Sequence, residues 1–334
     1  MYKSKVTSLA LLRGIAVIAV CFCHFGKPVA AGNILPGMFQ WFSDNGKYGV
    51  HIFFVISGFV IPFSLWRAQY SLKDYFPFLY KRLLRLHPPY LIALAITLVI
   101  SAASYYSRHL INPETPLTIL KSLVYAHAPI DNPVFWTLRV EAQYYIFIGL
   151  FFIMVREYKI LALCVGIPIF VLLGQTQVIN YLVFFNFATF FFIGTVGFLI
   201  YNSEVKPTLE WIMLLFLILF SFYFYEVGGA MASAITVLFI LFFRKTVSPI
   251  YEHPGEISYS IYLLHFPIGT KLINLLQRFT NPSYYWVLFT VALIVVYATG
   301  WMFWKYVETP AARWSNNVKY GKAKTTFKNY SLKS

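Results

Sequence analysis

The sequence predicts an all-α integral membrane protein with about ten transmembrane helices and both termini in the cytoplasm. Hydrophobic residues make up 59% of its 334 residues and charged residues only 12%, against about 25% charged in an ordinary soluble domain. So little polar surface cannot coat a water-soluble globule of this size. The apolar residues form long continuous runs, which indicate spanning helices rather than the alternating strands of a barrel.

Ten runs approach the roughly 20 apolar residues that a helix needs to cross a bilayer. They are Ser8–Phe25, Tyr48–Trp66, Pro88–Ser107, Phe135–Val155, Ile160–Gly174, Ile179–Tyr201, Leu209–Tyr225, Gly228–Phe243, Ile257–Leu276 and Tyr284–Trp304. The fifth and eighth runs are short, so we expect them to tilt or to enter the bilayer only in part.

Basic residues orient these runs, because Lys and Arg are enriched in the cytoplasmic loops of membrane proteins. With the N-terminus inside, 19 of the 27 Lys and Arg residues fall in cytoplasmic segments, 7 fall in outer loops or at span edges, and Arg13 lies within a span. This bias predicts an even number of spans. The net charge of +15 fits cytoplasmic retention and anionic lipid headgroups better than nucleic-acid binding.

The first span carries two polar side chains, Arg13 and His24. A charge inside a membrane costs about 3 kcal/mol on insertion scales, so each such residue is a candidate functional site. The 11-residue spacing is about three helical turns, which places both residues on nearly one face, ~16 Å apart along the axis. Arg13 is therefore expected near the cytoplasmic interface and His24 deeper, towards the outer side.

The second span contains Ser57-Gly58 and, four residues after the glycine, Pro62. Small residues let a neighbouring helix approach closely. Pro62 lacks the N–H that would bind the carbonyl of Gly58, so we expect a free carbonyl and a kink there.

The third span is preceded by Arg82 and Arg85, which are spaced i, i+3 and project to one side of a helix. Guanidinium forks match phosphate oxygens, so this pair suits a phosphate-bearing ligand at the cytoplasmic surface. Pro88-Pro89 is expected to start the span, because a proline at the first helical turn loses no hydrogen bond.

Two later spans also carry polar residues. The fourth opens with Trp136 and has an intramembrane carboxylate, Glu141, expected near the outer third and available to an arginine or a histidine. In the ninth, Ser258, Tyr262 and His265 follow the spacing i, i+4, i+7, which forms one polar stripe on an apolar helix. Proline at position 267 frees a carbonyl close to that histidine.

Each residue also has a plainer structural interpretation. Arg13 and His24 fit interfacial side chains, the arginine pair fits a cytoplasmic anchor, Glu141 fits a structural ion pair and His265 fits a hydrogen-bonded core histidine. A secretory signal peptide is a further alternative for the first thirty residues, but Arg13 lies where a signal has an uncharged core. No disulfide framework or zinc spacing is present among the three cysteines, and no metal is expected.

Taken in order, these segments resemble the acyltransferase-3 family of bacterial membrane acyltransferases. The matching parts are Arg13 with ten residues before His24, Phe53-Phe54-Val55-Ile56-Ser57-Gly58-Phe59, Arg82-x-x-Arg85 followed by His87-Pro88-Pro89-Tyr90, Trp136-Thr137-Leu138-x-x-Glu141, Ser258-Tyr259-Ser260-Ile261-Tyr262-Leu263-x-His265, and Glu308-x-Pro310. Each motif is weak alone, but six in sequence over nearly the whole chain are specific.

The resemblance implies transfer of an acyl group, most often acetyl, from cytoplasmic acyl-CoA to a hydroxyl of a glycan. Surface polysaccharides such as lipopolysaccharide O-antigen or exopolysaccharide are the usual acceptors, and the protein would be an O-acetyltransferase of the bacterial cytoplasmic (inner) membrane. His24 would be the essential histidine, Arg13 its motif partner, and Arg82 and Arg85 the cytoplasmic arginine motif.

For the mechanism we expect His24 to act as the base that takes the hydroxyl proton, since a neutral imidazole suits that role. An acyl-histidine intermediate is the open alternative. Glu141 would orient His24. Arg82 and Arg85 would hold the CoA phosphates, with the pantetheine arm passing Arg13 along a path to His24. Further pocket candidates are Ser57, Tyr262, His265 and Trp136.

We expect one membrane domain, residues 1–310, followed by a basic and loosely ordered cytoplasmic tail, residues 311–334. The main competing function is a transporter or exporter of a glycan or small molecule, which would also explain broken helices and intramembrane charge. No inverted repeat supports it. A scaffold is the third possibility, and it has no need for this many buried polar residues. The oligomeric state is open.

Overall fold

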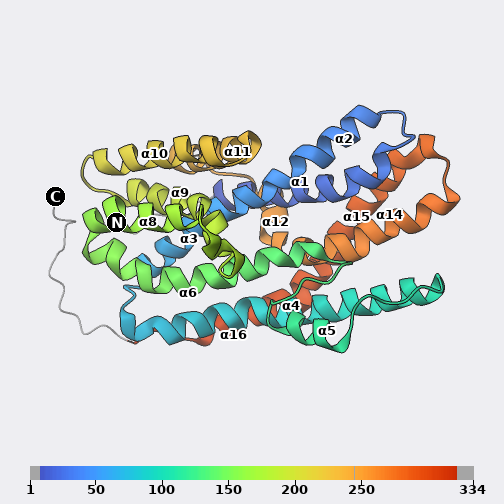
Figure 1. Ribbon diagram of the computed structural model, residues 1–334, viewed down its shortest axis with the longest axis horizontal. Coiled ribbons are helices and arrows are strands. Elements are labelled where there is room, and N and C mark those ends of the chain that lie inside the picture. The colour runs from blue at the N-terminus through green and yellow to red at the C-terminus, as the bar shows by residue number, and fades with distance from the viewer. Residues whose placement is uncertain (1–7, 244, 322–334) are drawn as a thin grey trace.

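The computed structural model describes residues 8–243 and 245–321, and throughout those ranges the secondary structure is helical with no strand. The predicted all-α class is confirmed. Most of the long helices run close to the long axis of the molecule, so the fold is an elongated bundle (Figure 1).

Eight helices form the body of the bundle. They are α1 (Ser8–Ala30), α3 (Gly49–Arg67), α4 (Tyr75–Ser107), α6 (Trp136–Glu157), α9 (Phe184–Asn202), α10 (Thr208–Phe224), α11 (Val227–Phe242) and α15 (Tyr285–Phe303). Shorter helices are α2 (Pro36–Asn45), α5 (Pro116–Leu123), α7 (Lys159–Leu161), α8 (Ile167–Leu173), α12 (Pro249–Glu256), α13 (Ser258–Leu264), α14 (Lys271–Leu276) and α16 (Thr309–Asn317). Three π-helical segments, η4 (Ala162–Gly166), η6 (His265–Thr270) and η9 (Trp304–Glu308), join neighbouring helices.

Six helical segments of the described chain are long and apolar enough to cross a bilayer: Ser8–Ala30, Pro36–Arg67, Leu72–Ser107, Pro133–Glu157, Phe184–Asn202 and Pro282–Asn317. Three shorter apolar helices, Lys159–Leu173, Thr208–Phe224 and Val227–Phe242, match further predicted spans. The predicted span Ile257–Leu276 is divided into α13, η6 and α14. The protein is therefore a multi-pass membrane protein.

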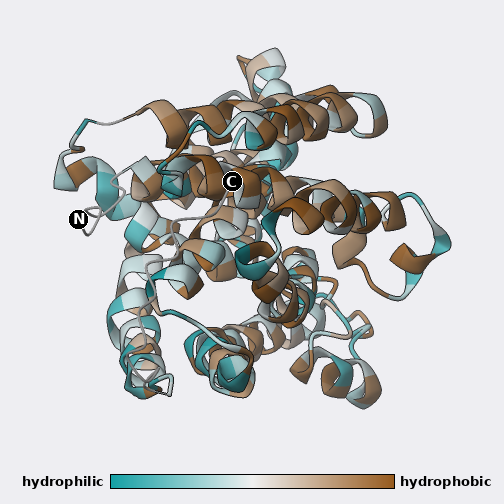
Figure 2. Cartoon of the chain, turned by 90° about the vertical axis from the view of Figure 1, so that its left-hand side faces the viewer, coloured by the Kyte–Doolittle hydropathy of each residue, from teal (hydrophilic) through white to brown (hydrophobic). Residues whose placement is uncertain are grey.

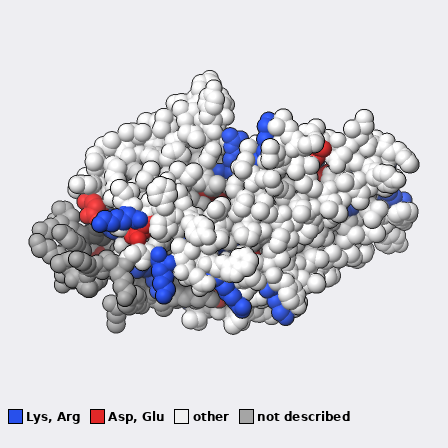
Figure 3. Space-filling view, turned by 90° about the horizontal axis from the view of Figure 1, so that it is seen from below, with Lys and Arg blue, Asp and Glu red and all other residues white. Residues whose placement is uncertain are grey.

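Peripheral helices turn apolar faces outwards, as lipid contact requires. On α10, Ile212, Leu215 and Leu219 are each about 60% exposed, and the helices in the upper part of Figure 2 are largely hydrophobic in colour. Seen from below, most of one face is free of charged side chains, which gather in a few places (Figure 3). A water-soluble protein would not leave so large an apolar surface uncovered.

Helices α3 and α9 pack with their backbones in close contact. A Cβ atom added at Gly58 would lie 1.9 Å from the carbonyl oxygen of Phe191, and one added at Gly194 would lie 2.0 Å from that of Val55. The predicted close approach at Ser57-Gly58 is confirmed. Pro62 leaves the carbonyl of Gly58 without a backbone donor. That carbonyl accepts a 3.1 Å hydrogen bond from Thr195 Oγ1, so α9 supplies the missing donor.

The predicted start of the third span is wrong. Helix α4 begins at Tyr75, and both Pro88 and Pro89 lie inside it. The helix follows a capping box formed by Ser71 and Asp74, and its basic stretch packs against α16, with Ser315 Oγ donating to the carbonyl of Lys81 at 2.9 Å. The site arginines of this stretch therefore stand on a rigid helix and not on a loop.

The prediction of a loosely ordered tail after residue 310 is also wrong for the first part of that tail. Residues 309–317 form α16, in which Ala311 and Ser315 are buried. Beyond it, Gly321 N donates to Asp74 Oδ1 at 2.9 Å. Residues 322–334 lie outside the described residues.

Candidate active site

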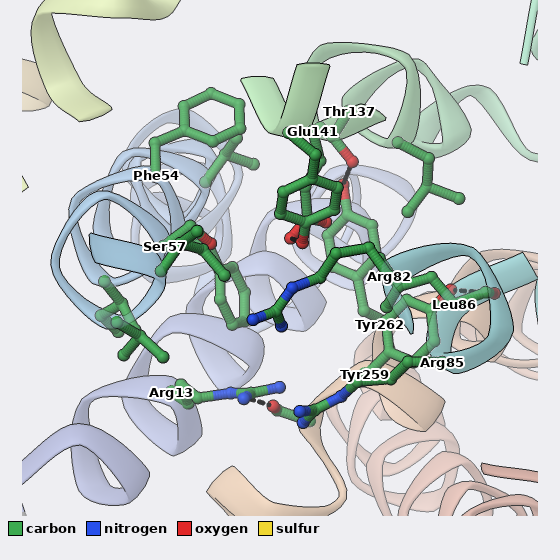
Figure 4. A pocket seen from close by; sticks show the side chains of 18 of the residues that line it. Arg13, Phe54, Ser57, Arg82, Arg85, Leu86, Thr137, Glu141, Tyr259 and Tyr262 are labelled. Atoms are coloured by element: carbon green, nitrogen blue, oxygen red, sulfur yellow. Dashed lines mark hydrogen bonds between the residues drawn. The ribbon is translucent and has the colours of Figure 1, made fainter. Parts of the chain in front are cut away.

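Helices α1, α3, α4, α6 and α13, together with η9, enclose a cavity of about 130 Å³ (Figure 4). We call it the arginine cavity. Its lining residues are Arg13, Val50, Phe53, Phe54, Ile56, Ser57, Val60, Ile61, Arg82, Arg85, Leu86, Thr137, Leu138, Glu141, Tyr145, Ser258, Tyr259, Tyr262 and Glu308. Segments from both ends of the chain thus build one site.

Three guanidinium groups point into this cavity (Figure 4). Arg13 Nε donates to Ser258 Oγ at 3.1 Å. Arg82 donates to Ser64 Oγ at 3.1 Å, and its guanidinium carbon lies 5.5 Å from the ring centre of Phe78. Arg85 is exposed and forms no hydrogen bond within the described ranges. Most guanidinium N–H groups therefore remain available to a ligand.

Two carboxylates face the same cavity. Glu141 accepts a hydrogen bond from the hydroxyl of Tyr145, one turn along α6. Glu308 is buried and accepts from Ser260 Oγ at 2.6 Å. Neither carboxylate forms an ion pair with any arginine of the cavity among the pairs found in the described chain. Three cationic side chains therefore face two anionic ones without neutralising each other by direct contact.

The hydroxyl groups of the lining are mostly occupied. Tyr262 shares a 2.8 Å hydrogen bond with Thr137 Oγ1 and donates to the carbonyl of Val134 at 3.1 Å. Tyr259 donates to the carbonyl of Leu86 at 2.8 Å. Ser57 also lines the cavity, so the two predicted hydroxyl candidates, Ser57 and Tyr262, lie beside the arginines.

His24 is not among the residues that line the arginine cavity. Its partly buried ring lies 5.2 Å, centre to centre, from both His265 and Phe266. His265 in turn lies 5.6 Å from the ring of Tyr262, which does line the cavity. The arginine cavity therefore does not reach His24, and the rings of Tyr262 and His265 link the two places.

The predicted partnership of Glu141 with His24 is not found. Glu141 lies in the arginine cavity and is bonded to Tyr145, because its face of α6 turns towards α1 and α4 beside the arginines. Trp136 does not line the cavity either; its ring packs 5.0 Å from that of Phe187 and is 38% exposed. His265 also lies outside the lining.

Sequence reasoning did not select Glu308, Tyr145 and Tyr259 as site residues. Glu308 was visible as part of Glu308-x-Pro310, and Tyr145 was visible because i, i+4 neighbours meet on a helix face. The free carbonyl expected near Pro267 is found, since Leu263 O accepts from Asn132 Nδ2 at 3.2 Å.

Comparison with known proteins shows the family of the chain. The family model described as an acyltransferase domain (Acyl_transf_3) matches residues 6–301. The chain belongs to this acyltransferase family. It is therefore a multi-pass membrane acyltransferase, and every residue that lines the arginine cavity except Glu308 lies inside the matched region.

One curated relative of this acyltransferase comes from Acidianus two-tailed virus and bears the name "Putative acetyltransferase ORF330". The two are 29% identical over 295 residues, covering 79% of this chain and 84% of the viral protein. No solved structure matches the acyltransferase significantly.

Proposed function

We propose that this acyltransferase moves an acyl group, most simply acetyl, from cytoplasmic acyl-CoA to a hydroxyl of a cell-surface glycan such as lipopolysaccharide O-antigen or exopolysaccharide. The observation that carries the proposal is the arginine cavity, in which Arg13, Arg82 and Arg85 converge without forming ion pairs to its carboxylates. We place the protein in a bacterial inner membrane, with ten spans, both termini on the cytoplasmic side and the cavity serving that side.

Coenzyme A suits this cavity by charge and by shape. Its phosphates are multiply anionic, and a guanidinium offers paired N–H donors that match phosphate oxygens. Arg85, exposed and without a hydrogen-bond partner in the described ranges, would make the first contact. Arg82, held by Ser64 and stacked on Phe78, would present its remaining donors in a fixed direction. The apolar lining from α3 suits the pantetheine arm.

The reaction then joins the acceptor oxygen to the acyl carbon. His24 takes the proton of the acceptor hydroxyl, the oxygen attacks the thioester carbonyl and the C–S bond breaks. The proton returns from His24 to the departing CoA thiolate, so that an ester and free CoA result. An acyl-histidine intermediate is the second route to the same products.

The separation between His24 and the arginine cavity sets a condition on this mechanism. The thioester end must pass Tyr262, whose ring lines the cavity and lies 5.6 Å from that of His265. Movement of one tyrosine side chain is a smaller change than movement of a helix. The acceptor would approach the partly buried His24 from the opposite side, which keeps the two substrates on separate routes.

The test uses the purified protein in lipid nanodiscs with radiolabelled acetyl-CoA and surface glycan. We expect Arg85→Ala to raise the KM for acetyl-CoA about tenfold, because a hydrogen bond to a charged group contributes about 1.5–3 kcal/mol. Arg67→Ala is the matched control, since Arg67 ends α3 outside the cavity. We expect His24→Ala to abolish transfer.

Three results would contradict the proposal. Unchanged acetyl-CoA dependence in Arg85→Ala would remove the phosphate role. Full transfer by His24→Ala would remove the base. Glycan movement across the membrane of closed lipid vesicles that contain the protein, without any consumption of acetyl-CoA, would favour the transporter function instead.

A further inference from the structure

His265 is the most completely buried polar ring near the proposed reaction centre. It is 0% exposed and begins the π-helical segment η6. Its Nδ1 lies 2.7 Å from the carbonyl oxygen of Tyr262. A carbonyl oxygen can only accept a hydrogen bond, so Nδ1 is the donor. In the neutral ring this choice of tautomer places the lone pair on Nε2.

That lone pair has no partner in the described structure. Nε2 of His265 is buried and forms no hydrogen bond. Buried polar atoms are nearly always satisfied, so an unsatisfied one needs an explanation. A purely structural histidine would gain by bonding both nitrogens, whereas this one keeps a fixed acceptor free.

The nearest imidazole to that acceptor is His24. The ring centres of the two histidines lie 5.2 Å apart with an interplanar angle of 42°. An N–H···N hydrogen bond of about 2.9 Å between the edges of two imidazoles also sets their centres about 5 Å apart. The two rings therefore already lie at the separation of a hydrogen-bonded pair. The His24 ring is partly exposed and forms no hydrogen bond in the described chain, so no such bond opposes a change in its orientation.

We propose that His265 is a positioning residue for His24: its Nε2 accepts the N–H of the His24 ring in the reactive state. The proposal rests on the base role of His24 in the proposed function. With one nitrogen donating to His265, the other nitrogen of His24 keeps its lone pair for the acceptor hydroxyl. The order of hydrogen bonds is then hydroxyl to His24, His24 to His265, and His265 to the carbonyl of Tyr262.

His265 thereby takes the orienting role that a carboxylate has beside catalytic histidines elsewhere. It differs in carrying no charge, which suits a buried position. The proton balance of the reaction is unchanged, because the transferred proton stays on the outer nitrogen of His24 and leaves with the CoA thiol. The neighbouring ring of Phe266, 5.2 Å from His24, limits the orientations that His24 can adopt.

Two conservative variants distinguish the roles of the two ring nitrogens of His265. His265→Asn keeps an amide donor near the position of Nδ1 and removes the acceptor at the position of Nε2. His265→Gln places an amide oxygen close to the position of Nε2. We expect His265→Asn to lower kcat about 10- to 100-fold with the KM for acetyl-CoA unchanged, and His265→Gln to restore most of the lost kcat.

Equal losses in the two variants, or full kcat in His265→Asn, would overturn the positioning role while leaving the proposed function intact. Full activity in His24→Ala would refute the base assignment itself, so the two failures are distinguishable. If His265→Asn does not fold, solid-state NMR of the ¹⁵N-histidine-labelled protein gives the answer on native His265. With acetyl-CoA and glycan acceptor bound, its Nε2 resonance should differ between the wild type and His24→Ala, and an unchanged resonance in that state would overturn the proposal.

Discussion

Arg13 Nε donates a 3.1 Å hydrogen bond to Ser258 Oγ across a sequence separation of 245 residues. Ser258 Oγ in turn donates to the carbonyl of Gly255 at 2.8 Å. The serine hydroxyl is thus fixed as an acceptor for Arg13, and the rest of the guanidinium remains directed into the arginine cavity. This contact joins the first helix to the polar stripe of α13 and sets the position of one wall of the site.

The first prediction concerns that contact. Ser258→Ala removes the acceptor, so Arg13 should lose its fixed direction and the KM for acetyl-CoA should rise about tenfold, as expected for a hydrogen bond to a charged group. Steady-state kinetics with acetyl-CoA as the varied substrate measure this. Ser233→Ala is the control, because the buried Ser233 lies outside the cavity lining and donates within α11 to Gly229 O at 2.8 Å. An unchanged KM in Ser258→Ala would show that Arg13 needs no such support.

The second prediction concerns ionic strength. Because Arg85 is exposed, its attraction to an anionic donor is open to screening by salt. The KM for acetyl-CoA should increase from low to physiological salt in the wild type, and Arg85→Gln should show a weaker dependence. Kinetics at several sodium chloride concentrations test this. Parallel salt dependence in both proteins would argue against contact between Arg85 and the phosphates.

The third prediction concerns Tyr262. Tyr262→Phe removes the hydroxyl that bonds Thr137 and Val134, which should lower the free energy of unfolding by about 1 kcal/mol. The freed ring should move more easily, so kcat should not fall. Thermal unfolding in detergent and single-turnover transfer measure the two effects, with exposed Tyr251→Phe as the control. A large fall in kcat at unchanged stability would instead give the hydroxyl a part in the chemistry.

The fourth prediction concerns the contact between α3 and α9. Gly58→Ala places a Cβ 1.9 Å from the carbonyl oxygen of Phe191, a clash with backbone that side-chain movement cannot relieve. We expect the free energy of unfolding to fall by about 2–3 kcal/mol or more, so that little folded protein is obtained. Gly37→Ala is the matched control, since an added Cβ there meets nothing within 4 Å. Size-exclusion chromatography in detergent compares the yields, and wild-type yield of Gly58→Ala would contradict this packing.

Several features followed from local sequence because their causes are local. Continuous apolar runs predicted helices, and helices are found at all ten predicted runs, although Ile160–Gly174 and Ile257–Leu276 are interrupted by π-helical turns. A proline removes one N–H wherever it lies, so a free carbonyl at Gly58 was predictable. The i, i+3 spacing of Arg82 and Arg85 placed both guanidinium groups on one side of α4, where both line the cavity.

Other features depended on partners that no local pattern specifies. Glu141 could have met His24 or the arginines, and the rotation of α6 in the bundle chose the arginines. His24 was expected to line the donor site, but it lies beside His265. The partner of the basic stretch in α4 was also distant in sequence, since Ser315 of α16 donates to the carbonyl of Lys81.

The lipid environment of this acyltransferase, its helices and its polar residues within the spans could be predicted from the amino-acid sequence, because hydropathy, periodicity and missing N–H donors act within a few residues. Which of those polar residues share a cavity depends on how the helices pack. Helices meet where small residues permit close approach, as at Gly58 and Gly194, and each meeting depends on the packing of all the others. Glu308 thus lines the arginine cavity beside Arg13, and the ring of His265 lies beside that of His24.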